Sequence, residues 1–67
     1  MRLSARNQLK EKIVEVKKGT TTAHVRIDIG GAIVTSSITN ATVDDLELHV
    51  GDDAWAVIKA SDVMIGK

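Results

Sequence analysis

The chain of 67 residues contains no cysteine and only two histidines, His24 and His49. Disulfide bonds are therefore excluded, and so is a zinc site of the usual Cys/His kind. A domain this short buries only about 60% of the surface that its unfolded chain exposes, and small domains usually add a disulfide, a metal or oligomerisation. We therefore expect one domain that is stabilised by oligomerisation.

The chain also lacks an excess of charge of either sign, and it lacks long apolar runs. Nine basic and nine acidic residues give a formal net charge of zero. This balance argues against partners recruited by bulk charge, such as duplex DNA or an anionic membrane, but not against a local anion site. No apolar run approaches the roughly 20 residues of a membrane span, and residues 1–4 lack the apolar stretch of a signal peptide. We expect a cytoplasmic protein.

The chain has no proline, and strand patterns dominate it. The clearest is residues 20–29, where apolar and polar residues alternate as in a half-buried strand. Gly30-Gly31 then predicts a two-residue hairpin turn, since both glycines accept positive φ. Residues 32–39 are the expected returning strand. The apolar positions of the first of these strands are Ala23, Val25, Ile27 and Ile29.

Two segments have mixed patterns. Residues 7–17 are expected to be a strand, because β-branched residues lead into a turn signal, although good helix formers at 9–12 make a helix the rival interpretation. Residues 42–48 predict a short helix with Thr42 as its N-cap. Asp44 and Asp45 would then lie at the positive end of the helix dipole. Its apolar residues Val43, Leu46 and Leu48 would face the sheet.

Residues 54–60 and 62–65 are the last expected strands, and Trp55 is expected in the core or an interface. The order of three strands, a helix and two strands predicts an all-β fold: a small five-stranded OB-like barrel with one short helix between strands three and four. The edges of so small a barrel need covering. Strand exchange or edge pairing between subunits would cover them.

Catalysis and nucleic-acid binding have little support. The chain has no cysteine nucleophile, no G-x-S-x-G elbow, no P-loop and no H-E-x-x-H motif, and His24 and His49 are expected on the surface. Barrels that bind single strands stack bases on aromatic rings in a basic groove. With one Trp, no Phe and no Tyr, this chain cannot form such a platform. We expect a protein that is not an enzyme and binds no nucleic acid.

Three segments have the chemistry of an anion site. Ser4 and Arg6 offer a hydroxyl and a guanidinium fork on one side of an extended chain. Lys59 and Ser61 repeat this spacing, and residues 39–42 are rich in donors before the expected helix. Each segment alone has an ordinary explanation: a solvated tail, a snorkelling lysine beside a turn serine, and helix capping. Only their combination indicates a site.

Specific motifs occur along almost the whole chain. The most specific are Ser-Ala-Arg-Asn-Gln-Leu at 4–9 and Lys-Ala-Ser-Asp-Val at 59–63. The others are Val-Lys-Lys-Gly at 16–19, Ile-Thr-Asn-Ala-Thr at 38–42, Val-Gly-Asp at 50–52, and Ala-Val-Ile before and Met-Ile after the 59–63 motif. Together they resemble the molbindin (Mop) family, whose module also occurs in the TOBE-type domains of molybdate transport and regulatory proteins. The resemblance implies that residues 1–67 form a single molybdate-binding Mop domain.

The resemblance also implies a cytoplasmic protein that buffers or stores molybdate, with tungstate as a mimic. Relatives are hexamers, trimers of dimers, with the anions between subunits. Carried over by residue, the oxyanion site would contain Ser4, Ala5 (backbone) and Arg6 of one subunit, Lys59, Ala60 (backbone) and Ser61 of a neighbour, and Thr39, Asn40 and Thr42 nearby. A possible second site would contain Lys18, Gly19 and Thr20, with Lys17 in the same turn.

Two other functions remain open at this point. One is a structural or regulatory module that senses molybdate and contacts a protein partner. The other is an OB-type nucleic-acid binder, against which the missing aromatic residues count.

Overall fold

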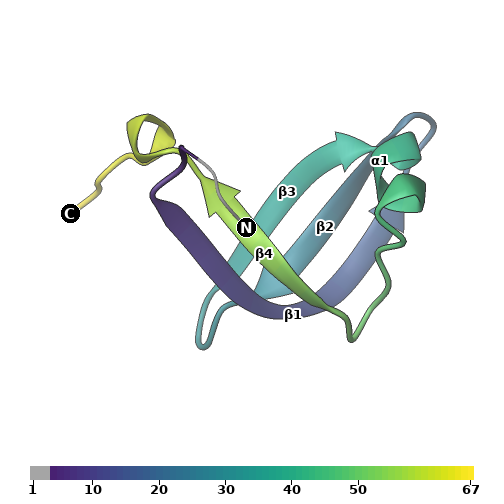
Figure 1. Cartoon of the computed structure of the whole chain (residues 1–67), viewed down its shortest axis with the longest axis horizontal. Helices are drawn as coiled ribbons and strands as arrows, with labels where there is room; N and C mark the ends of the chain where they lie inside the picture. Colours follow the sequence, from purple (N-terminus) through teal and green to yellow (C-terminus); the bar gives the residue numbers. More distant parts are fainter. Residues whose placement is uncertain (1–3) are drawn as a thin grey trace.

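The computed structural model describes residues 4–67, which form one curled antiparallel sheet with a short helix (Figure 1). The sheet order is β3-β2-β1-β4. The mostly-β prediction with one short helix is confirmed. In chain order the elements are β1 (Asn7–Lys18), β2 (Thr22–Asp28), β3 (Ile33–Thr39), α1 (Asn40–Asp45), β4 (Asp53–Ile58) and the 3₁₀ helix η1 (Ala60–Asp62).

The prediction of a fifth strand at residues 62–65 is wrong. After β4 the chain makes the single 3₁₀ turn η1, closed by the Asp62 N–H to the Lys59 carbonyl at 2.9 Å. The segment after it runs away from the sheet and pairs with no strand of the described residues 4–67 (Figure 1). Residues 4–67 therefore form a four-stranded half-barrel and not the closed five-stranded barrel that was expected.

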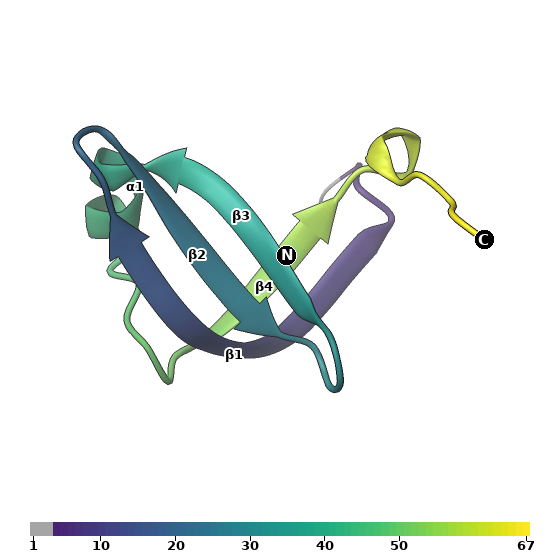
Figure 2. The same ribbon diagram turned by 180° about the vertical axis from the view of Figure 1, so that it is seen from behind.

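β1 is a strand and not the rival helix, and a bulge divides it in two. Its first half pairs with β4, from Asn7 opposite Ile58 to Lys12 opposite Asp53. Its second half pairs with β2, and the register shifts between Ile13 and Glu15. An extra residue in one strand bends that strand and increases its twist. The bend gives the sheet two arms, β1–β4 and β1–β2–β3, that are splayed like a V (Figures 1 and 2).

The core lies inside this bend. β2 alternates buried and exposed residues along its whole length, which confirms the period-two prediction. Ile13, at the bulge, is the largest fully buried side chain of the described residues. The cluster of buried side chains consists of Ile13, Ala23, Val25, Ile27, Val43 and Ala56. So small a core is what a chain of this length is expected to have.

The hairpin between β2 and β3 is as predicted. Gly30 and Gly31 have φ values of 86° and 104°, and the Ile29 N–H donates to the Ala32 carbonyl at 2.9 Å. Positive φ at both central positions is what a two-residue turn requires. This turn sets the β2–β3 register, in which Asp28 lies opposite Ile33.

α1 begins two residues earlier than predicted. Its N-cap is Thr39 and not Thr42: the Thr39 hydroxyl accepts the Thr42 N–H at 3.1 Å. Asp44 and Asp45 therefore lie at the end of the helix and not at its positive N-terminus, so the dipole argument for them is wrong. Lys18 forms an ion pair with Asp44 instead.

The apolar residues around α1 divide between core and surface. Val43 is buried and Leu48 packs against the core, as predicted, but Leu46 is 62% exposed because it lies past the last helical turn. No helix in residues 4–67 is long and apolar enough to cross a bilayer.

Glu47 ends α1 in a left-handed conformation, with φ of 52°. The Leu48 N–H to the Val43 carbonyl and the Glu47 N–H to the Asp44 carbonyl, both 3.1 Å, form a Schellman motif, in which glycine is usual. We expect Glu47→Gly to raise the free energy of unfolding by about 0.5–1 kcal/mol in urea denaturation, because glycine has no Cβ penalty there. The control Asp45→Gly, inside the helix, should lower it by a similar amount. A destabilised Glu47→Gly variant would contradict the motif.

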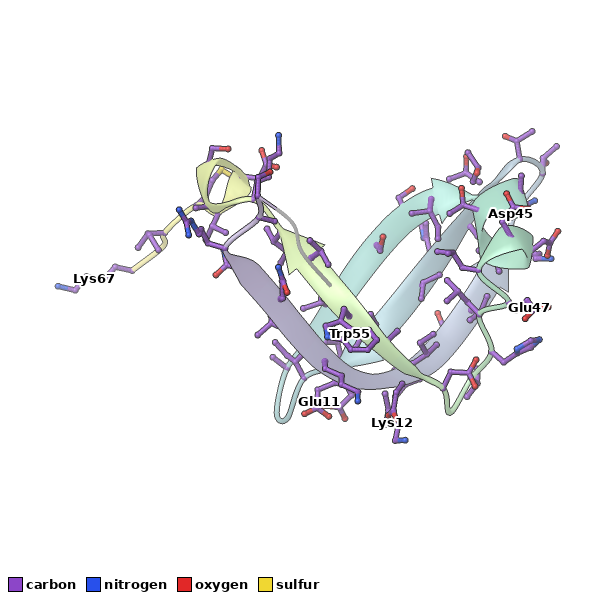
Figure 3. The ribbon with its side chains drawn as sticks, in the orientation of Figure 1. Glu11, Lys12, Asp45, Glu47, Trp55 and Lys67 are labelled. Carbon is purple, nitrogen blue, oxygen red and sulfur yellow. The ribbon has the colours of Figure 1, made fainter. Side chains whose placement is uncertain are left out.

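Trp55 is 48% exposed, so its placement in the core of a single chain is wrong. It lies on β4 opposite Lys10, whose ammonium is 5.1 Å from the centre of the ring (Figure 3). The strand predicted at residues 54–60 is confirmed as β4, in which Ala54, Ala56 and Ile58 face inward. A place for Trp55 in an interface between subunits stays a prediction.

Candidate oxyanion-binding site

The two most specific motifs lie together at one end of the sheet. Asn7 pairs with Ile58, and its side-chain amide donates to the Ile58 carbonyl at 3.1 Å. Because β1 and β4 are antiparallel, the segment before Asn7 and the segment after Ile58 leave the sheet side by side (Figure 1). We call residues 4–6 and 59–61 the β1–β4 end. One chain therefore brings together two segments that the resemblance assigns to neighbouring subunits.

The side chains of the β1–β4 end are available to a ligand. Ser4, Arg6, Lys59 and Ser61 are exposed, whereas Ala5 is buried at 9% exposure and anchors its segment to the body. Lys59 is extended (φ −62°, ψ 140°) and precedes η1. The amide N–H groups that open such a turn have no partner within it. The end thus offers two cations, two hydroxyls and backbone donors, with the Asp62 carboxylate as the one opposing charge in η1.

The other predicted residues lie at the opposite end of the sheet. Thr39 caps α1, and Asn40 and Thr42 lie in its first turn. They lie beside the end of β1 at Lys18 and the β1–β2 turn with Gly19 and Thr20 (Figure 1). Asn40 fastens the two together: its side-chain amide donates to the carbonyls of Gly19 at 3.0 Å and Thr20 at 3.3 Å. We call these six residues the α1 end. A single chain does not unite it with the β1–β4 end.

Most polar groups of the α1 end already have partners inside the chain. The hydroxyls of Thr39 and Thr42 are 2.7 Å apart, and Lys18 is paired with Asp44. The Asn40 Nδ2 atom donates to two backbone carbonyls, and the Oδ1 atom is buried without a hydrogen-bond partner among the described residues. Asn40 thus presents an acceptor and not a free donor. The geometry indicates that Asn40 positions the turn, and the exposed β1–β4 end is better suited to an anion.

We expect Asn40→Ala to lower the free energy of unfolding by about 1–2 kcal/mol, because two hydrogen bonds between α1 and the β1–β2 turn are lost. Urea denaturation at fixed protein concentration measures this. Asn40→Asp keeps the shape but removes the donor, so it should be destabilised similarly. If Asn40→Asp kept full stability, the hydrogen bonds of the Asn40 amide would not be what holds α1 to the β1–β2 turn.

An ion pair lies where β1 bends. The Lys12 ammonium is 2.7 Å from Asp53 Oδ1, and both side chains are more than half exposed. The hydrogen bond and the charge of Lys12 lower the pKa of Asp53 below its ordinary value, and Asp53 raises the pKa of Lys12. Because the Asp53 pKa is lowered on folding, the pair favours the folded chain above the pH at which an unpaired aspartate titrates. This contribution is lost as the pH falls through the folded-state pKa.

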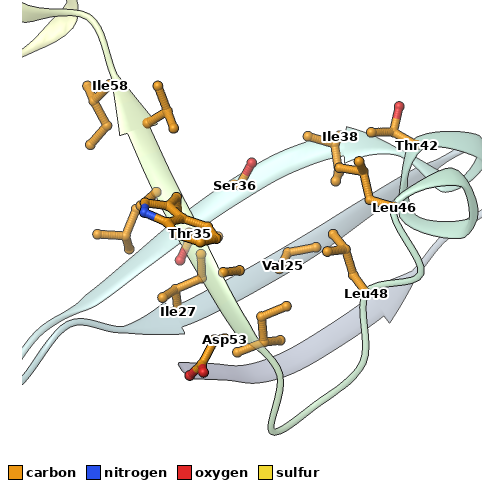
Figure 4. Close-up of a pocket in the computed structure, with 16 residues that line it drawn as sticks. Val25, Ile27, Thr35, Ser36, Ile38, Thr42, Leu46, Leu48, Asp53 and Ile58 are labelled. Atoms are coloured by element: carbon orange, nitrogen blue, oxygen red, sulfur yellow. The ribbon is translucent and has the colours of Figure 1, made fainter. Parts of the chain in front are cut away.

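The sequence did not predict the cleft between the two arms of the V. It has a volume of about 620 Å³ and is lined mainly by apolar side chains of β2, β3 and β4 (Figure 4). The inward residues of β3 and β4, such as Val34, Ile38 and Ile58, are only half-buried there. Apolar residues alternate in both β3 and β4. This alternation predicts which face of each strand points inward, but it does not predict whether the inward faces of the two strands pack against each other.

Comparisons with known proteins agree with this architecture. Residues 3–65 match the TOBE domain family. Molybdenum-pterin-binding protein 3 of Clostridium pasteurianum is 53% identical over 66 residues, which cover 97% of each chain. The chain superposes on the structure of a molybdate-binding protein from Sporomusa ovata with a TM-score of 0.94 and 36% identity, over the full length of both.

A second solved structure, the cytoplasmic molybdate-binding protein ModG with molybdate bound, is 40% identical with a TM-score of 0.89. The match covers 96% of this chain and 46% of ModG. The resemblance that the motifs indicated is confirmed by a match along almost the whole sequence. This chain belongs to the TOBE domain family.

Proposed function

We propose that this protein binds molybdate, with tungstate as a mimic, and buffers or stores it in the cytoplasm. The observation that carries the proposal is the full-length likeness to the Sporomusa ovata molybdate-binding protein. The cytoplasmic location is supported by the description of ModG. The relatives are named for binding and not for catalysis, so we infer a binding protein and not an enzyme.

The β1–β4 end has the chemistry that this function needs. Burying a dianion removes its hydration, which only opposite charge and several hydrogen bonds can offset. Arg6 and Lys59 supply the charge, and Ser4, Ser61 and the amides of Ala5 and Ala60 supply donors. A shell made mainly of cations and N–H donors disfavours protonated phosphate, because the O–H of that anion finds few acceptors there. Molybdate, tungstate and sulfate are fully deprotonated and fit it, and pocket size selects among them.

We propose further that the functional unit is a homo-oligomer, a hexamer built as a trimer of dimers, with anions between subunits. The support is physical: large apolar side chains stay exposed, including Leu46, Val50 and Trp55 at 62%, 63% and 48%. Exposed apolar surface on so small a domain marks an association surface. Association would also bring the α1 end of one copy to the β1–β4 end of another, which one chain alone does not do.

Native mass spectrometry with and without molybdate tests this proposal. We expect an oligomer that gains a discrete number of molybdate ions, gains tungstate equally and ignores phosphate at the same concentration. A monomer that binds none of these ions would refute the proposal. An oligomer that binds no oxyanion would refute the buffering function, but it would agree with the proposed homo-oligomer.

A further inference from the structure

A carboxylate lies directly beside the residues of the β1–β4 end, and its charge opposes an anion. Asp62 follows Ser61 in η1, and its side chain is exposed. Asp62 forms no ion pair with any other residue in 4–67, the part of the chain that the structure describes. Its negative charge is therefore not neutralised by a neighbouring side chain, and it acts on an anion that binds there.

The geometry of η1 places Asp62 close to Lys59. The Asp62 N–H donates to the Lys59 carbonyl at 2.9 Å, so the two residues are the first and last positions of one tight turn. The α-carbons of two such positions lie within about 7 Å of each other. This separation is shorter than the Debye length of about 10 Å at 0.1 M salt. An anion held by the Lys59 ammonium therefore experiences the charge of Asp62.

The charges at this place match a singly charged anion better than a doubly charged one. Arg6 and Lys59 supply two positive charges, which by themselves would balance a dianion. Together with Asp62, the three side chains carry a single net positive charge. Molybdate would leave one negative charge uncompensated, whereas a monoanion would leave none. Because the Coulomb energy is proportional to the product of the charges, Asp62 repels a dianion about twice as strongly as a monoanion of the same size.

We propose that Asp62 is a specificity-determining residue of the oxyanion site, which lowers the affinity for dianions and keeps bound molybdate exchangeable. The inference rests on the proposed function, since the anion has to bind at the β1–β4 end. A protein that buffers an ion also has to release it. The charge of Asp62 weakens the binding of the ion without removing any group that contacts it.

Calorimetry with two tetrahedral oxyanions of different charge tests this role. Asp62→Asn keeps the shape of the side chain and removes its charge. At low salt we expect the variant to bind molybdate about threefold more tightly than the unsubstituted protein does. The gain for perrhenate, which carries a single charge, should be below about twofold. In about 1 M sodium chloride, where the Debye length is about 3 Å, both gains should disappear.

Two further variants separate the local charge from other causes. Glu15→Gln removes a carboxylate charge from an exposed position on β1, opposite Arg26 and away from the β1–β4 end. It should leave the affinity for molybdate unchanged. Asp62→Glu keeps the charge and should bind molybdate as the unsubstituted protein does. The hydrogen bond that closes η1 uses the backbone N–H of residue 62, so all of these substitutions retain it.

Failure of the inference can be told apart from failure of the proposed function. If the unsubstituted protein binds neither anion, the proposed function fails, and the role of Asp62 fails with it. If it binds molybdate and Asp62→Asn binds molybdate equally or more weakly, only the inference fails. Equal gains for molybdate and perrhenate, or a gain that persists at high salt, would show that residue 62 acts through the shape of the turn. Either result would overturn its role as an opposing charge.

Discussion

Arg6→Ala is expected to weaken molybdate binding at least tenfold. Hydrogen bonds to a charged group contribute about 1.5–3 kcal/mol, and about 1.4 kcal/mol corresponds to a factor of ten in affinity. Arg6 is exposed beside Lys59 and Ser61 at the β1–β4 end, so its fork is free to hold two oxygens of the anion. Isothermal calorimetry on the oligomeric variant measures the change.

The control for this prediction is Arg26→Ala. Arg26 is also exposed, but it lies on β2 opposite Thr35, away from the β1–β4 end. The Arg26→Ala substitution changes the net charge of the protein by the same amount as Arg6→Ala. It therefore separates the loss of a local contact with the anion from the effect of overall charge on affinity. We expect Arg26→Ala to bind molybdate almost as the unsubstituted protein does. Equal losses in both variants, or unchanged affinity in Arg6→Ala, would defeat the assignment of Arg6.

Ile13→Ala is expected to have the largest effect on stability. Ile13 is 1% exposed at the bulge of β1, and its backbone N–H and C=O bond to Asp52 and Gly51 at 2.9 and 2.8 Å. Truncating a buried isoleucine to alanine costs about 2–5 kcal/mol. A domain of this size has a total stability of only several kcal/mol at about 0.05–0.15 kcal/mol per residue. Urea denaturation should therefore show a protein that is largely or wholly unfolded.

Val14→Ala is the matched control, because Val14 is the next residue and is 43% exposed. Surface substitutions of this kind usually change stability by less than about 0.5 kcal/mol. Both variants must be compared at one protein concentration, since association stabilises the folded state by mass action. Equal stability of Ile13→Ala and the unsubstituted protein would mean that the bulge is not the centre of the core.

The candidate site was only partly accessible to sequence reasoning. The repeated spacing of a hydroxyl and a cation, Ser4 with Arg6 and Lys59 with Ser61, singled out the two segments of the β1–β4 end. Their adjacency in one chain depends on the register of β1 with β4, which no local pattern encodes. The role of Asn40 was also hidden, because its hydrogen bonds to Gly19 and Thr20 are contacts between distant segments.

The sequence by itself determined the hairpin turn at Gly30-Gly31, the two strands that it joins and the inward face of β2, because these follow from alternation and from backbone conformations of single residues. Only the tertiary structure decided that β1 bends at Ile13, that the two arms stay splayed and that residues 62–65 leave the sheet. The physical reason is that a strand exists only where another strand accepts its hydrogen bonds. Whether a partner edge is within reach is a property of the whole chain and not of the local pattern.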